Sequence, residues 1–429
     1  MQIEVREIPV LREELHVGRL SSGLTVFVLP RPGFHKKYAS FATHYGSVDN
    51  CFVPPGGRRV CVPDGIAHFL EHTLFEKENG NASDWFSELG ASSNAYTSYL
   101  LTTYLFSCTD RFEACLDILL NFVLEPYFSP ANIEKERGII EQELLMYDDM
   151  PDRRVILALL EALYHEHPVR VDIGGTVQSI REVTAELLTA CYDTFYHPEN
   201  MSLVVLGDVE PVRVIEQVAE NVDRRGFAKR GAIERIFPAE PPQVRERRVE
   251  IEMTASRPRL ALGFKELPEA APGRGQLRER LLMGLVLRSL FGRSSPLYSA
   301  LYEDGLIDDS FYSYYESSPT YGHTLVGGET DDPDKLLDRL QSGIAEHVDR
   351  GIDADEFERL RRAYLGRFLD NFNSLEQVAA SFLSHHVRGS WLFDTFELVE
   401  SLTVEEANDR LQRHFASENF SVAILRPKG

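Results

Sequence analysis

Cysteine is scarce in this sequence, and long apolar runs are missing. The 429 residues include five cysteines, which are Cys51, Cys61, Cys108, Cys115 and Cys191. Because their number is odd and no C-x-x-C spacing occurs, we expect reduced thiols in a reducing compartment, with neither a disulfide framework nor a cysteine-bound metal. No apolar run approaches the roughly 18 residues of a membrane-spanning helix. The N-terminal segment is charged and has no apolar signal-peptide core, which favours the cytoplasm.

The sequence also contains fewer basic than acidic residues. Lys and Arg total 45 against 67 Asp and Glu, which gives a formal net charge of −22. Such a field repels phosphate backbones and anionic lipids, so nucleic acid and membrane surfaces are poor partners, whereas a cationic peptide would be attracted. Hydrophobic residues make up 43% and charged residues 26%, the balance of a folded globular protein. The length predicts more than one domain.

The chain repeats itself weakly. Residues 183–206 and 402–425 share a pattern of a Thr-capped helix, an aromatic turn and an apolar strand. Two further pairs of segments are similar. One pair begins at Thr109 and Thr330, the other begins at Glu134 and Glu356, and all three pairs occur in the same order along the two halves. We therefore predict two homologous halves that arose by duplication, spanning 1–225 and 247–429. The linker between them, 226–246, is charged and proline-containing.

Each half mixes strands with helices that do not strictly alternate, which predicts an α+β fold. Alternating apolar residues predict two strands within 24–47, and a short apolar run predicts another at 202–207. Helical spacing of apolar residues predicts helices over 64–77, 110–124, 131–147, 152–166 and 184–196.

The segment from Asp64 to Phe75 carries the strongest chemical pattern. His68 and His72 are four residues apart, so on a helix both imidazoles lie on one face and can bind one divalent ion, with zinc as the expected metal. Glu71 projects beside them and can act as a general base without occupying a coordination position. Asp64 is expected to cap the helix. The alternative is a solvated helix face that happens to carry two histidines.

A catalytic zinc needs a third protein ligand, and four glutamates downstream compete for this role. Glu136 and Glu143 are seven residues apart and share a helix face, whereas Glu134 and Glu141 fall outside it. The shared face lies within an apolar arc, with Ile133, Ile140, Leu144 and Tyr147 on one side and Ile139 and Met146 on the other. Buried carboxylates need a compensating partner. We therefore predict Glu143 as the third ligand and Glu136 as the acid that orients a ligand histidine. An ordinary salt-bridged helix is the alternative.

The second half offers an internal comparison, because it contains no H-x-x-E-H pattern. Glu136 corresponds to Glu358, but Glu143 corresponds to Leu365, and Arg288 lies roughly where the metal helix would be. We therefore expect one half to carry the chemistry and the other to serve as scaffold, lid or substrate wall.

These motifs resemble the pitrilysin/insulinase family, which includes the mitochondrial processing peptidases. His68-Phe-Leu-Glu71-His72 matches the metal motif of the family, Glu136 and Glu143 match its distal glutamates, and Ser93–Thr97 matches a segment that lies along bound peptide. Gly174-Gly175-Thr176 and Tyr196–Met201 are also similar to family signatures. The resemblance covers essentially the whole chain, which looks like the short bacterial type.

The resemblance implies a clamshell of two α+β halves around an enclosed chamber, with one Zn²⁺ per chain and cleavage of short or unfolded peptides. It also implies that peptide adds to the strand through Asn94, Ala95 and Tyr96. Short members of the family work in pairs, so we expect a homodimer or a heterodimer with a homologous metal-less chain.

One segment departs from the family pattern. Active members carry an Arg and a Tyr in the second half, but Tyr302 stands at the expected Arg position and the usual Tyr is missing. The leading interpretation is therefore a zinc endopeptidase completed by a partner chain. The alternative is a catalytically silent subunit that binds peptides or scaffolds a complex.

Overall fold

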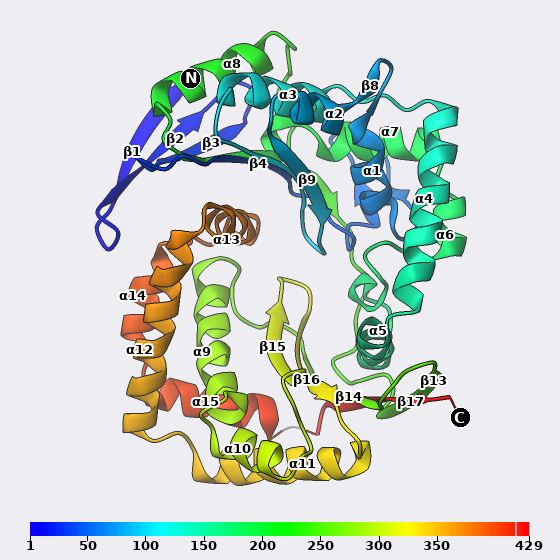
Figure 1. The fold of residues 1–429 in the computed structure, drawn as a ribbon, viewed down its shortest axis with the longest axis vertical. Coiled ribbons are helices and arrows are strands. Elements are labelled where there is room, and N and C mark those ends of the chain that lie inside the picture. The colour runs from blue at the N-terminus through cyan, green and yellow to red at the C-terminus, as the bar shows by residue number, and fades with distance from the viewer. Residues whose placement is uncertain (417, 429) are drawn as a thin grey trace. The chain divides into compact units, whose positions relative to one another are not determined.

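The computed structural model describes residues 1–416 and 418–428 (Figure 1). These residues form two compact units, and each unit is assembled from three separate stretches of sequence. Unit 1 contains residues 1–144, 172–237 and 371–387, and unit 2 contains residues 145–171, 238–370 and 388 onward.

Unit 1 is built on a seven-stranded sheet with the strand order β1-β2-β3-β11-β4-β10-β9. The pair β3 and β11 is parallel, and the other neighbouring pairs are antiparallel. Central strands β4 and β11 are buried along almost their whole length because both of their faces are covered. The strands are β1 (Gln2–Ile8), β2 (Glu13–Arg19), β3 (Thr25–Pro30), β4 (Lys37–Thr43), β9 (Ser92–Thr97), β10 (Thr102–Cys108) and β11 (Met201–Gly207).

Helices pack on this sheet around one continuous apolar core that includes Phe41, Phe69 and Leu203. The helices that begin in unit 1 are α1 (Ile66–Phe75), α2 (Ala82–Glu88), α3 (Phe112–Leu124), α4 (Pro130–Asp148), α6 (Val177–Arg181), α7 (Ala185–Phe195), α8 (Pro211–Asp223) and α13 (Leu375–Val387). Two small sheets are also present. One consists of β5 (Cys51–Val53), β6 (Val60–Cys61) and β12 (Glu234–Arg235), and the other consists of β7 (Glu76–Lys77) and β8 (Gly80–Asn81).

The prediction that all cysteines are reduced is wrong for one pair. Cys51 and Cys61 form a disulfide because β5 and β6 are antiparallel and place these two residues opposite each other. The Pro54-Pro55-Gly56-Gly57 sequence between them is a turn signal that could have identified this hairpin. Cys108, Cys115 and Cys191 are free thiols, and all three are buried.

Unit 2 contains a five-stranded sheet with the order β13-β17-β14-β16-β15. Its strands are β13 (Arg248–Met253), β14 (Arg259–Glu266), β15 (Tyr312–Ser317), β16 (Gly322–Glu329) and β17 (Phe420–Pro427). The helices that begin in unit 2 are α5 (Pro151–Leu163), α9 (Arg274–Phe291), α10 (Pro296–Glu303), α11 (Pro333–Arg350), α12 (Ala354–Asp370), α14 (Asp394–Ser401) and α15 (Val404–Phe415). A second apolar core, which includes Leu262, Val286 and Leu340, lies between them.

The two sheets share one topology. The run β3-β11-β4-β10-β9 in unit 1 and the run β13-β17-β14-β16-β15 in unit 2 each begin with a parallel pair and continue with three antiparallel pairs. Chain order then matches α1 with α9, α4 with α12 and α7 with α15. The α+β class is confirmed, and the matching topology of the two sheets is what two homologous halves require.

One helix of each unit comes from the opposite half of the sequence. Helix α13 follows α12 along the chain but packs on β4 and β11 of unit 1, where Phe382 contacts Phe27 at a ring separation of 4.6 Å. Helix α5 follows α4 but packs on β14 and β17 of unit 2. The compact units are therefore not continuous stretches of sequence.

The expected linker, 226–246, contacts unit 1 through its first part and unit 2 through its second part. Strand β12 pairs with β5 in unit 1, and the Arg235 side chain donates a hydrogen bond of 2.9 Å to Asp49. In unit 2 the Glu240 carboxylate accepts backbone N–H bonds from residues 165–167 and pairs with Lys265 at 2.5 Å. The division between the compact units falls between Phe237 and Pro238.

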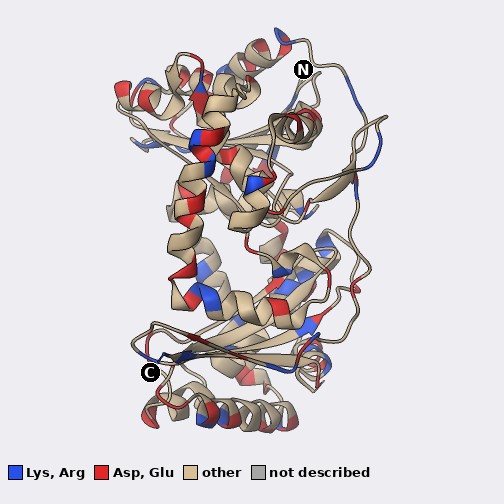
Figure 2. Ribbon diagram, turned by 90° about the vertical axis from the view of Figure 1, so that its right-hand side faces the viewer, with Lys and Arg blue, Asp and Glu red and all other residues tan. Residues whose placement is uncertain are grey.

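Charge is distributed over many elements. Acidic residues are spread along helices of both units and basic residues lie among them (Figure 2). None of the described helices combines the length and the apolarity needed to cross a membrane.

Candidate metal centre

Helix α1 positions the two predicted histidine ligands. Its apolar side chains, among them Phe69, Leu70 and Leu74, are fully buried, and this fixes the rotation of the helix. His68 and His72 are consequently placed together on the partly exposed side, with ring centroids 4.7 Å apart. Both imidazoles therefore share one face of the helix, as their four-residue spacing predicts.

The expected N-cap at Asp64 is wrong. Gly65 occupies the N-cap position with φ of 85°, and no side chain caps the helix. The Asp64 carboxylate instead accepts a hydrogen bond from the Asn50 side chain. A Cβ atom on Gly65 would lie 2.2 Å from the carbonyl oxygen of Gly174, so this close approach requires glycine.

Helix α4 supplies the carboxylates. It buries Ile133, Glu136, Ile140 and Leu144 toward the core of unit 1. Part of the predicted apolar arc is wrong, because Ile139 is 45% exposed and Met146, beyond the limit of unit 1, is 54% exposed. The buried stripe is narrower than the sequence suggests, yet Glu136 and Glu143 still lie on the side that faces α1.

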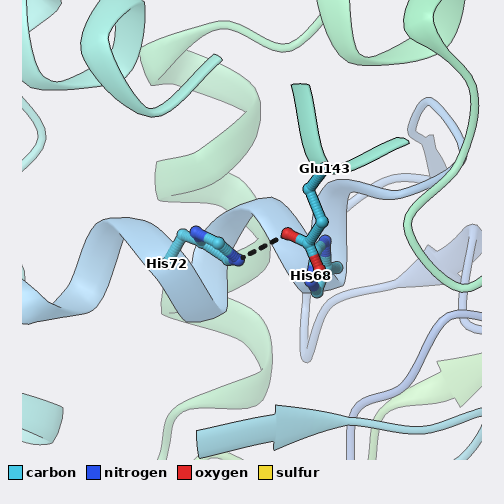
Figure 3. A group of neighbouring side chains, drawn as sticks. All are labelled: His68, His72 and Glu143. Carbon is cyan, nitrogen blue, oxygen red and sulfur yellow. Dashed lines mark ion pairs between the residues drawn. The ribbon is translucent and has the colours of Figure 1, made fainter. Parts of the chain in front are cut away.

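Three side chains of unit 1 converge at this place, and Figure 3 shows how they lie. One Glu143 oxygen is 3.8 Å from Nε2 of His68, and the other is 3.4 Å from Nε2 of His72. Their candidate ligand atoms all lie within 4.8 Å of one another. Ligands bound tetrahedrally to zinc at about 2.0–2.1 Å are separated by about 3.4 Å, so this donor set fits a zinc ion with only small side-chain movements. Two imidazoles and one carboxylate also leave a coordination position open.

Glu136 lies behind His72, away from Glu143. Its Oε2 atom is 3.4 Å from Nδ1 of His72, and the residue is only 5% exposed. Burial alone would lower the pKa of His72, but the flanking carboxylates of Glu136 and Glu143 raise it to about 9. The negative field at this ring favours a cation at the site, either a proton or a metal ion.

Glu71 lies on the same helix and is 8% exposed. Its Oε2 atom accepts a hydrogen bond of 2.6 Å from the Thr97 hydroxyl, a partner that the sequence analysis did not assign. Burial raises the pKa of Glu71, although the Thr97 hydrogen bond opposes the shift. Thr97 thereby fixes the Oε2 atom of this carboxylate.

Strand β9 brings the predicted peptide-binding residues next to this group, because Thr97 is its last residue. β9 pairs with β10 on one side and ends the strand order of the sheet, so its other edge has no strand partner among the described residues. On this strand Asn94 is exposed, while Ala95 and Tyr96 are half-buried. The Asn94 side chain accepts a 2.9 Å hydrogen bond from the backbone N–H of Ala95.

In the second half, the described residues contain no comparable group of metal-binding side chains. Tyr302, at the position where the family pattern has Arg, is 57% exposed at the end of α10 and stacks on Tyr298. Asp308, farther along the same segment, forms an ion pair of 2.6 Å with Arg257.

Known protein families match both parts of the chain. Residues 62–177 match the family described as insulinase (peptidase family M16), and residues 182–364 match the family described as peptidase M16 inactive domain. The first match includes His68, Glu71, His72, Glu136 and Glu143 within its bounds.

Individual relatives extend over nearly the whole chain. The chain is similar to a Bacillus subtilis protein named uncharacterized zinc protease YmfH, with 42% identity over 423 residues, 98% of this chain and 99% of that protein. A second B. subtilis protein, named uncharacterized zinc protease YmxG, is 24% identical over 85% of this chain and 89% of its own length.

Solved structures give the same result. An M16-like peptidase from Alicyclobacillus acidocaldarius superposes with a TM-score of 0.93 at 40% identity, covering 100% of this chain and 99% of that one. A protease from Helicobacter pylori has a TM-score of 0.84 at 20% identity, covering 97% of this chain and 100% of its own, and supports the fold alone.

Proposed function

The chain belongs to the insulinase (M16) family of peptidases, and from this premise we propose that it is a zinc-dependent endopeptidase that hydrolyses short or unfolded peptides. The observation that carries the proposal is the convergence of His68, His72 and Glu143 on one point. The buried carboxylate of Glu71 lies on α1, the helix that also carries both histidines. A structural zinc site would close with a fourth protein ligand, whereas this group of three leaves a position for substrate.

The proposed mechanism assigns a role to each side chain. His68, His72 and Glu143 would hold zinc, which supplies Lewis acidity for attack by water on a peptide carbonyl. Glu71 accepts the proton of the attacking water and delivers it to the leaving amine. The Thr97 hydroxyl holds Oε2 of Glu71, so Oε1 carries the proton. Glu136 keeps the His72 ring in orientation through Nδ1.

We propose that the substrate peptide binds as an additional strand along the free edge of β9. Main-chain pairing of this kind selects extended backbone more than sequence, which suits short or unfolded peptides. The Asn94, Ala95 and Tyr96 positions would then lie beside the substrate backbone. The backbone N–H of Ala95, which now donates to the Asn94 side chain, would then donate its hydrogen bond to a carbonyl oxygen of the substrate.

We propose that the active form is a dimer, either of two copies or with a homologous metal-less chain. Tyr302 in place of the family Arg supports this, because the carbonyl-holding donor then has to come from elsewhere. The mass of the native complex purified from its own cells, with identification of every chain, tests this proposal. A silent peptide-binding subunit is the second candidate, and the same Tyr302 favours it.

The decisive experiment compares Glu71→Gln with Glu88→Gln, an exposed change on α2, in the native complex. Glu71→Gln should retain zinc but lower the cleavage of an unstructured peptide at least about 100-fold, whereas Glu88→Gln should leave cleavage unchanged. A chelator should abolish cleavage, and added zinc should restore it. Cleavage that persists in Glu71→Gln would contradict the general-base role. A zinc-loaded wild-type complex that cleaves no peptide would favour the silent subunit.

We retain the cytoplasm as the proposed location, although the cysteines no longer support it. In a reducing compartment the Cys51–Cys61 bond should be open. Alkylation of thiols in intact cells, followed by mass spectrometry, should then label both residues. Protection of both cysteines from alkylation would place the chain in an oxidising compartment.

A further inference from the structure

In unit 2, helices α9 and α12 take the places that α1 and α4 take in unit 1, as the shared strand topology shows. The residues at this place are basic and aromatic, with no metal-binding group among the described side chains. Arg280 and Arg288 lie on α9, and Tyr364 and Arg367 lie on α12. We call these four residues the arginine cluster.

The cluster is defined by helix geometry and contacts. Positions 280, 284 and 288 follow one face of α9, since residues four apart lie one turn apart. The Arg288 guanidinium lies over the ring of Tyr364, 5.4 Å from its centroid. Gly284 lies between the two arginines, where a Cβ atom would meet the Tyr364 ring at 3.6 Å. This face of α9 therefore carries two guanidinium groups beside the ring of Tyr364, and the residue between them, Gly284, has no side chain.

Among the described residues, no carboxylate forms an ion pair with an arginine of the cluster. Arg280 is half-buried and forms no ion pair or hydrogen bond with any described residue, and its nitrogens are not sealed from solvent. The neighbouring carboxylate of Glu316 is already paired with Arg388 at 2.6 Å. Burial and the charge of Arg388 lower the pKa of Arg280 to about 10, and burial and Arg367 lower that of Arg288. Arg280 is repelled by Arg388, and Arg288 is repelled by Arg367. Because these positive charges are partly removed from water, binding of an anionic ligand beside them is favourable.

We propose that the arginine cluster binds a carboxylate of a peptide, either its C-terminus or an Asp or Glu side chain. Arginine presents a planar fork of donors that matches a carboxylate, and Tyr364 keeps the fork of Arg288 in place. The net charge of −22 opposes binding of a polyanion, so a single carboxylate on a peptide suits the site better than nucleic acid. Strand β15, which contacts α9 and ends the sheet of unit 2, offers a second free edge for an extended chain.

This inference rests on the peptide-binding function proposed above, but its test does not need cleavage. Affinity is measured by fluorescence anisotropy with the Glu71→Gln protein and four versions of one labelled peptide. The versions carry an acidic or an amide side chain near the end, each with a free or an amidated C-terminus. We expect at least one carboxylate to strengthen binding about tenfold, and added salt to weaken this preference.

The double variant Arg280→Gln/Arg288→Gln should remove that preference and leave the affinity of the fully amidated peptide unchanged. Arg359→Gln/Arg362→Gln is the matched control, because it removes the same charge from exposed positions on the opposite face of α12. Sensitivity to side-chain amidation or to C-terminal amidation identifies which carboxylate is bound. Equal affinity for all four peptides, or equal losses in both double variants, would overturn the proposal. A zinc-loaded wild-type protein that binds acidic peptides selectively but does not cleave them would refute only the peptidase function.

Discussion

At the scale of single residues, the candidate metal centre has a buried acidic neighbour besides its three candidate ligands. Glu136 is a buried carboxylate, and Lys135 approaches it no closer than 3.9 Å. Its nearer ionic contact is Nδ1 of His72, at 3.4 Å. A carboxylate in this position selects the His72 tautomer that leaves Nε2 free to bind metal.

Glu136→Gln should therefore weaken zinc binding about 10- to 100-fold while the fold is retained. Competition with a chelator of known affinity measures the effect, and circular dichroism verifies the fold. Glu134→Gln on the exposed face of α4 is the matched control and should bind zinc like the wild type. Equal zinc affinity in the two variants would show that Glu136 does not support His72.

His323 should make the free energy of unfolding of unit 2 depend on pH. It is 2% exposed, Tyr164 lies 3.0 Å from its Nδ1 atom, and burial with the nearby His167 lowers its pKa from 6.5 to about 3. The unfolded chain therefore binds one more proton between these pH values. Stability should be fully present above pH 6.5 and fall on acidification, by about 1.4 kcal/mol per pH unit for this group.

Denaturant unfolding across this pH range, monitored for unit 2, measures the slope. His323→Gln should make it shallower by one proton, because the titrating group is gone while a hydrogen-bonding side chain remains. Exposed His35 provides the control, and His35→Gln should keep the wild-type slope. An unchanged slope in His323→Gln would show that this imidazole does not control the acid sensitivity.

At the scale of elements, the segment from Asp172 to Thr176 holds the start of α1. Gly175 has φ of +77°, and a Cβ atom there would lie 2.4 Å from the carbonyl oxygen of Asp64. The Ser179 hydroxyl donates to that same oxygen at 2.7 Å. This close backbone contact fixes where α1 begins, and thus where His68 lies.

Gly175→Ala should displace the start of α1 and lower zinc affinity at least about tenfold. Gly90→Ala is the matched control, since Gly90 has φ of +72° but no atom near its Cβ position. Both changes should cost the roughly 1–2 kcal/mol of a left-handed residue, and Gly175→Ala should cost more because of the clash. Thermal unfolding and zinc titration separate these two effects. Equal zinc affinity in both variants would contradict the positioning role.

Local patterns predict elements well where the deciding interactions are local. Thr184 and Thr403 cap α7 and α15 as their sequences indicate, because a hydroxyl reaches the N–H group three residues ahead. The four-residue spacing likewise places His68 and His72 on one face. Asp64 failed as a cap because Asn50, distant in sequence, binds its carboxylate. The contact of Glu71 with Thr97 depends on the packing of α1 against the end of β9, which no local pattern encodes. The Cys51–Cys61 pair is a local hairpin, and its turn signal lies in the sequence between the two cysteines.

At the scale of the whole molecule, the exchanged helices link the two halves of the sequence. The buried residues of α13 include Val378, Phe382 and Leu383, which cover the sheet of unit 1. The buried residues of α5 include Val155, Leu159 and Leu163, which cover the sheet of unit 2. Fully burying such a side chain contributes about 1.5–3 kcal/mol, so each exchanged helix contributes an amount comparable to the roughly 5–15 kcal/mol stability of a domain.

Separately produced fragments 1–237 and 238–429 should consequently fail to fold, since each lacks the helix that covers its sheet. We expect neither fragment to show a cooperative thermal transition by near-ultraviolet circular dichroism, and fragment 1–237 to lack specific zinc binding although it contains His68, His72 and Glu143. Co-expression of the two fragments should restore both properties, because α5 and α13 can then reach their sheets. As a control, a fragment of residues 1–237 joined through a flexible linker to 371–387 should fold better than 1–237 alone. Cooperative unfolding of the isolated 1–237 fragment would show that α13 is dispensable for unit 1.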